Sequence, residues 1–73
     1  GFVAPMNGTI VEILAASGQS VEAGTTLIIM EAMKMEHAMH APSDGVVGEI
    51  YYGVGDLVEG GMLLLDFEQQ QST

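Results

Sequence analysis

The sequence is poor in positive charge. Lys34 is its only lysine or arginine, against ten aspartate and glutamate residues. The resulting net charge of −9 disfavours binding to nucleic acid or to anionic membranes, and it suits a domain that meets basic protein surfaces. We therefore expect no nucleic acid and no membrane among its partners.

Cysteine is absent, so neither a disulfide nor a thiolate metal site can stabilise this chain of 73 residues. A chain of this size must rely on one compact apolar core, which a hydrophobic content of 48% can supply. Apolar runs such as residues 27–30 are too short to cross a membrane. No signal or transit pattern is present, and the glycine at position 1 suggests a piece of a longer chain.

The chain contains an internal repeat with a shift of 37 residues. The segment "APMNGTIVEILAASGQSVEAGTTLIIME" (4–31) aligns without a gap with "APSDGVVGEIYYGVGDLVEGGMLLLDFE" (41–68), and eleven of the 28 aligned positions are identical. Two copies are too few for a solenoid. We therefore expect one closed domain with a pseudo-two-fold axis.

Each copy has the composition of strands and turns. Strands are predicted where β-branched, aromatic and other apolar residues gather, at 9–14, 27–30, 46–52 and 62–65. Asn7-Gly8 and Asp44-Gly45 are typical of tight hairpin turns with positive φ, and a second turn is expected at 22–24 and 59–61.

No segment combines helical periodicity with helix caps. The sequence therefore predicts an all-β fold, a flattened β-barrel or sandwich of two four-stranded antiparallel sheets. We expect the domain to span residues 1–68, followed by a polar, disordered tail at 69–73.

Lys34 lies in the segment between the two copies. Residues 27–32 and 35–41 are strand-like, which leaves Met33 and Lys34 as a two-residue hairpin loop. Such a loop favours Asn-Gly, because both positions need positive φ, and Met and Lys disfavour that conformation. A local violation of this kind is typical of functional sites. The pseudo-symmetry predicts Lys34 at one end of the domain and both termini at the other.

Alternation along the two hairpin strands assigns their side chains to opposite faces. The more apolar face, expected to point inward, carries Ile28, Met30, Met35, His37 and Met39. The other face carries Leu27, Ile29, Glu31, Glu36, Ala38 and His40. Because His37 and His40 fall on opposite faces and Met30 and Met39 belong to the core, we expect no metal site, including a thioether site for Cu(I). We expect His37 to be partly buried and hydrogen-bonded.

The motif around Lys34 resembles the biotinyl-lysine signature of biotin carboxyl carrier domains. The segments "APMNG", "VEAG", "EAMKMEH", "AP.DG" and "VGDLVE.G" are similar to that family, and the likeness covers residues 3–67. "MKMEH" followed by "AP.DG" looks most like the carrier domain of acyl-CoA carboxylase α subunits of the methylcrotonyl-CoA type. The gapless repeat leaves no room for the thumb insertion found in some acetyl-CoA carboxylase carriers.

The resemblance implies a carrier with biotin bound covalently to Lys34, and no catalytic residue of its own. A biotin protein ligase would attach the biotin, which would then carry carboxylate between a biotin carboxylase domain and a carboxyltransferase subunit. The isolated domain is expected to be a monomer, and the whole enzyme to be located in the bacterial cytoplasm or the mitochondrial matrix. Ala32, Met33 and Met35 flank the lysine in the signature.

Several alternatives stay open at this point. Met33 and Met35 can serve a ligase pocket or simply complete the hairpin, and Glu31 and Glu36 can recognise a partner or be a solvated pair. A lipoyl carrier domain of a 2-oxo acid dehydrogenase complex shares the fold and the hairpin lysine, but in that family the lysine usually follows Asp and lacks the second Met. An unmodified acidic interaction module is a further alternative.

Overall fold

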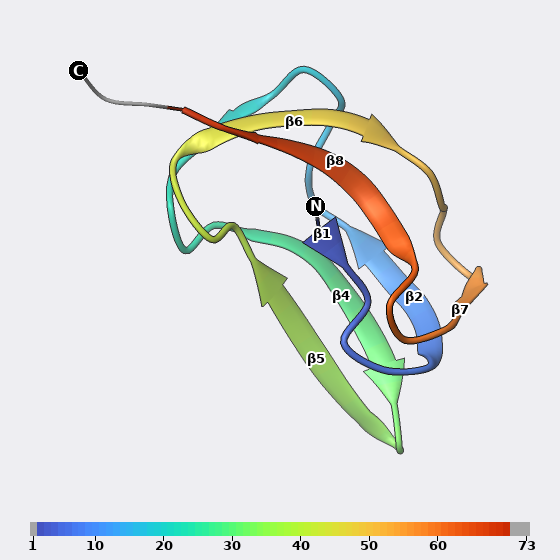
Figure 1. Ribbon diagram of the computed structural model, residues 1–73. Helices are drawn as coiled ribbons and strands as arrows, with labels where there is room; N and C mark the ends of the chain where they lie inside the picture. The colour runs from blue at the N-terminus through green and yellow to red at the C-terminus, as the bar shows by residue number, and fades with distance from the viewer. Residues whose placement is uncertain (1, 71–73) are drawn as a thin grey trace.

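The two copies of the repeat fold into equivalent strands. The computed structural model describes residues 2–70, which form eight strands and no helix (Figure 1). The strands are β1 (Phe2–Val3), β2 (Gly8–Ile13), β3 (Ser20–Val21), β4 (Thr26–Ala32), β5 (Met35–His40), β6 (Gly45–Ile50), β7 (Leu57–Val58) and β8 (Leu63–Gln69). Adding 37 to the bounds of β2, β3 and β4 gives those of β6, β7 and β8. Within this part of the chain there is also no helix long and apolar enough to cross a membrane.

The strands form two four-stranded antiparallel sheets, as predicted. The hairpin sheet has the strand order β5-β4-β2-β7, and the opposite sheet has the order β1-β8-β6-β3. The two-residue strand of each copy pairs with a strand of the other copy: β7 pairs with β2, and β3 pairs with β6. Neither sheet can therefore form from one copy alone. The connection between β2 and β3 has the same length as that between β6 and β7, so no thumb is inserted.

Hydrogen bonds between the copies occur in symmetric pairs. The Gly24 amide donates to Ala41 O at 2.9 Å, and the equivalent Gly61 amide donates to Ala4 O at 2.8 Å. Both glycines have positive φ, 86° and 90°, which fits the turns predicted at 22–24 and 59–61. The turns of each copy are therefore held by the backbone of the other.

Asn7-Gly8 and Asp44-Gly45 are not hairpin turns, contrary to our prediction. Gly8 and Gly45 are the first residues of β2 and β6, and neither is among the glycines with positive φ. The prediction was wrong because an Asn-Gly or Asp-Gly pair reports a local preference, whereas here the polar side chain serves a contact distant in sequence.

That contact again links the two copies. Asn7 Oδ1 accepts a hydrogen bond of 2.8 Å from the Gly60 amide, and Asp44 Oδ1 accepts one of 2.8 Å from the Ala23 amide. Asn7 and Asp44 are equivalent in the repeat, as are Ala23 and Gly60. Each side chain thus satisfies a backbone donor in the turn of the other copy.

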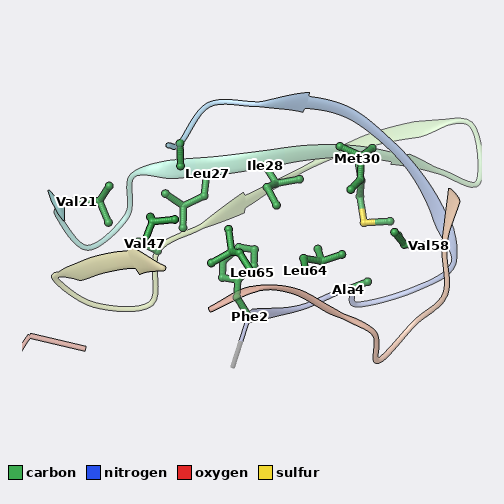
Figure 2. Close-up of a cluster of buried hydrophobic side chains, with 13 residues drawn as sticks. Phe2, Ala4, Val21, Leu27, Ile28, Met30, Val47, Val58, Leu64 and Leu65 are labelled. Carbon is green, nitrogen blue, oxygen red and sulfur yellow. The ribbon is translucent and has the colours of Figure 1, made fainter. Parts of the chain in front are cut away.

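The core lies between the two sheets (Figure 2). The fully buried side chains are Ile10, Leu27, Ile28, Met30, Val47, Leu64 and Leu65. Leu27 corrects our prediction, which placed it on the outer face of β4. Thr26 pairs with His40 and Ile28 pairs with Met39, so Leu27 is the extra residue of a β-bulge and turns inward.

The last strand continues further than the sequence indicated. We expected a disordered tail from residue 69, but Gln69 ends β8 opposite Gly45, and the Gln70 amide donates to Asp44 O at 2.9 Å. The rest of the predicted tail, 71–73, lies outside the described residues. Residue 1 does as well, so the expected placement of both termini concerns residues that the structure does not describe.

Candidate functional site

Lys34 lies at the tip of the β4–β5 hairpin, as predicted. Ala32 and Met35 form the last pair of the two strands, which leaves Met33 and Lys34 as the turn. Their φ angles are 54° and 64°, and they are the only non-glycine residues with positive φ among residues 2–70. Positive φ at both central positions is the geometry of a type I′ hairpin turn, which disfavours these residue types. The turn holds the exposed Lys34 at the end of the hairpin.

The base of the turn is tightly packed although its tip is exposed. Ala32 is only 5% exposed. Gly8 lies so close beside β4 that a Cβ atom there would be 2.5 Å from Glu31 O and 2.6 Å from Met30 Cε. Only glycine fits this approach of β2 to β4 without a shift of the backbone. The base of the hairpin is therefore closely packed against β2.

His37 adds a polar contact at the same base. Its Nε2 lies 3.3 Å from Ala32 O, and because a carbonyl can only accept, Nε2 carries the proton. His37 is half-buried, so the prediction of a partly buried, hydrogen-bonded histidine is confirmed. His40 contacts a different partner, with Nδ1 3.0 Å from Thr26 Oγ1.

The four methionines near the turn differ sharply in exposure. Met30 is fully buried and lies at the hairpin end of the core, near Val58 in Figure 2. Met33 and Met35 are 86% and 63% exposed, and Met39 is half-buried. Met35 thus lies at the margin of the inward face on which the sequence placed it. Two flexible thioether side chains are available to a partner on either side of Lys34.

Glu31 and Glu36 lie directly opposite each other in the sheet and are both exposed. Like charges at such a pair disfavour strand pairing. The site residues that the sequence singled out thus occupy the last two strand pairs of one hairpin and its turn. Within residues 2–70, no group of three or more His, Cys, Asp or Glu side chains is arranged to bind a metal ion.

Tyr51 forms a side-chain contact that the sequence did not suggest. Its hydroxyl donates a hydrogen bond of 2.7 Å to Asp66 Oδ2, and this bond is the main cause that raises the pKa of Tyr51 to about 12. The equivalent residues of the first copy, Leu14 and Ile29, cannot form such a bond. The contact belongs to the second copy alone.

A family model described as biotin-requiring enzyme matches residues 1–67. The chain belongs to this family. The family model and the two relatives described next support a biotin carboxyl carrier domain, and the cofactor of the family is biotin.

Two curated relatives illustrate the similarity. The α subunit of mitochondrial methylcrotonoyl-CoA carboxylase from Mus musculus is 39% identical over 72 residues, which cover 99% of this chain and 10% of that protein. The biotin carboxyl carrier protein of acetyl-CoA carboxylase from Solanum lycopersicum is 42% identical over 62 residues, which cover 85% of this chain and 89% of that protein. The chain thus spans about a tenth of the length of the first relative.

A solved structure shows that the fold extends to lipoyl carriers. The lipoyl domain of the 2-oxoglutarate dehydrogenase complex from Azotobacter vinelandii has a TM-score of 0.80 at 27% identity, covering 90% of this chain and 84% of that one. The identity to the two biotin-related proteins is higher, which supports biotin over the lipoyl alternative.

Proposed function

We propose that Lys34 is the residue that carries biotin, through an amide between its side-chain nitrogen and the carboxyl group of biotin. The observation that carries this proposal is the position of Lys34. It is the only lysine of the chain, and it is exposed at a turn whose positive φ angles are unfavourable for methionine and lysine. An exposed primary amine on a firmly packed hairpin fits such a linkage, because an enzyme can reach it without unfolding the domain.

The domain would act as a mobile carrier within a biotin-dependent acyl-CoA carboxylase. When bound, biotin supplies the chemistry of taking up and releasing carboxylate. The chain itself supplies position: the packed base around Ala32 and Gly8 fixes the hairpin, and the exposed Lys34 side chain adds reach. Tethering of this kind raises the effective concentration of the cofactor at each active site.

The proposed partners are a biotin protein ligase, a biotin carboxylase domain and a carboxyltransferase subunit. A carrier that visits successive active sites must also leave them, so its contacts should be small and transient. The mouse relative, a methylcrotonoyl-CoA carboxylase subunit, supports an enzyme of that substrate type. We propose no catalytic residue in the carrier domain itself.

Intact-mass measurement tests the attachment. Wild-type protein and Lys34→Arg are each produced together with a biotin protein ligase and excess biotin. The wild type should gain the mass of one biotinyl group and Lys34→Arg should gain none, because the variant keeps the charge and lacks the amine. Equal biotin uptake by both proteins, or the mass of a lipoyl group on Lys34, would contradict the proposal.

A further inference from the structure

Leu57 is the most exposed large apolar side chain outside the lysine turn in residues 2–70. It is 79% exposed, and only Met33, at 86%, exceeds it. Leu57 belongs to the two-residue strand β7 at the edge of the hairpin sheet. Leaving a leucine in water at that position contributes nothing to the core.

The strand register places Leu57 in a row with the acidic pair of the hairpin. Leu57 is opposite Thr9, Thr9 is opposite Glu31, and Glu31 is opposite Glu36. Residues directly opposite each other point to the same face of a sheet. The four side chains, which we call the Leu57 row, therefore line the outer face of the hairpin sheet across all four strands.

The Leu57 row is close to Lys34. Glu31 precedes Lys34 by three residues, so their backbones are at most about 10 Å apart, the span of three extended residues. A protein contact of standard size covers about 800 Å² on each partner, equivalent to a disc with a radius of about 16 Å. An enzyme that holds the Lys34 amine in its active site through such a contact on this face would cover the row.

The other copy of the repeat shows that the fold does not require a leucine there. The equivalent row consists of Ser20, Val46 and Glu68, in the same register. Ser20 occupies the same position in β3 that Leu57 occupies in β7. A serine is therefore compatible with this backbone, and the leucine appears only at the end that carries the lysine.

We propose that the Leu57 row is a docking surface for the ligase that modifies Lys34, a proposal that rests on the proposed function. The partner surface would place an apolar pocket over Leu57 and Arg or Lys side chains beside Glu31 and Glu36. The charges support such a basic partner, since the chain has a net charge of −9 and loses its only lysine cation when that amine is acylated.

The ligase is the partner that depends most on this face. Before modification, the amine extends from the turn by no more than a lysine side chain, so the modifying enzyme must contact the domain itself. After modification, the longer arm lets other active sites act at a greater distance from the sheet. Contacts made by the Leu57 row therefore matter most in the attachment step.

Steady-state kinetics with purified biotin protein ligase, ATP and biotin test this docking surface. Leu57→Ser should lower kcat/KM for biotinylation about fivefold to thirtyfold, mostly through KM, the effect of losing an apolar anchor at an interface. Ser20→Leu, the matched change at the equivalent position, should leave kcat/KM unchanged. Glu31→Gln should lower kcat/KM and weaken its dependence on salt, whereas the equivalent Glu68→Gln should not.

Thermal unfolding of each variant separates docking from folding, and Leu57→Thr provides a second variant with high strand propensity. Wild-type rates for both well-folded Leu57 variants would overturn the docking proposal while leaving Lys34 as the attachment site. Normal biotinylation with slowed carboxylation by a biotin carboxylase would overturn it as well, in favour of a different partner. Failure of the wild type to take up biotin would instead contradict the proposed function.

Discussion

The two ends of the molecule have the same backbone framework and differ in what is attached to it. At the hairpin end, β4 turns through Met33 and Lys34 into β5, which has six residues. At the other end, the equivalent strand β8 ends at Gln69, and the strand paired with it, β1, has two residues that correspond to the last two of β5. The core, the bulges and the reciprocal hydrogen bonds are shared by both ends.

This difference leaves a symmetric framework with a single candidate functional end. Stability comes from contacts that occur twice, such as the Asn7 and Asp44 side chains that each satisfy a turn of the other copy. Features that occur once contribute little to the core and lie on the surface: the Met33-Lys34 turn, the exposed Met35 and Leu57. Substitutions at equivalent positions of the two copies can separate effects on stability from effects on the proposed function.

The largest effect on stability is expected at Met30, and Met35 on the next strand of the same hairpin provides the comparison. Met30→Ala should lower the free energy of unfolding by about 2–5 kcal/mol, because Met30 is fully buried and the change leaves a cavity. Met35→Ala should cost less than about 1 kcal/mol, because Met35 is 63% exposed, and should slow biotinylation by the ligase. Urea denaturation and biotinylation rates provide the two measurements. Equal losses of stability would show that the exposed end belongs to the core after all.

An intermediate effect is expected at Gly8 and Gly45, which occupy equivalent positions at the two ends. A Cβ atom would meet Glu31 O at Gly8 and Glu68 O at Gly45, so each change to Ala should lower the free energy of unfolding by about 1–3 kcal/mol. Gly53→Ala is the control, because its nearest contact is Asp56 Oδ2 at 3.9 Å, and it should change stability by less than about 0.5 kcal/mol. A large loss of stability at only one of these two glycines would show that the two ends are not packed equivalently.

The smallest effect concerns Tyr51, which has no counterpart in the first copy. The hydrogen bond to Asp66, with desolvation and the nearby carboxylates of Asp66 and Glu49, raises the pKa of Tyr51 from 10.0 to about 12. The folded state therefore holds the phenol proton more tightly than the unfolded state does. The resulting stabilisation is fully present below pH 10 and is lost as the pH rises towards 12.

Denaturation of wild type and Tyr51→Phe between pH 9 and pH 12 measures this contribution, since the phenylalanine variant lacks the hydroxyl. The wild type should be slightly more stable at the lower end of this range, and the difference should disappear as the pH approaches about 12. A difference that stays constant up to pH 12 would show that the Tyr51 hydroxyl does not contribute through its proton.

Much of the fold could be predicted because it depends on patterns that repeat along the chain. The 37-residue repeat, the strand-like runs and the absence of helical periodicity indicated two four-stranded sheets and a lysine hairpin between the copies. The predictions that failed depended on distant contacts. Asn7-Gly8 has the composition of a turn, and Leu27 falls on the outer face by strict alternation, but a contact with the other copy decides the first and a bulge decides the second.

The candidate site divides in the same way. The sequence by itself pointed to Lys34 as the proposed attachment residue, because a single lysine between two methionines and between two matching halves is a local signal that needs no coordinates. Only the tertiary structure decided what surrounds it. Leu57 and Lys34 are 23 residues apart in the chain, and strand pairing across β7, β2 and β4 brings Leu57 into the row of Glu31. Pairing between distant strands depends on the register of the whole sheet, which no short stretch of sequence specifies.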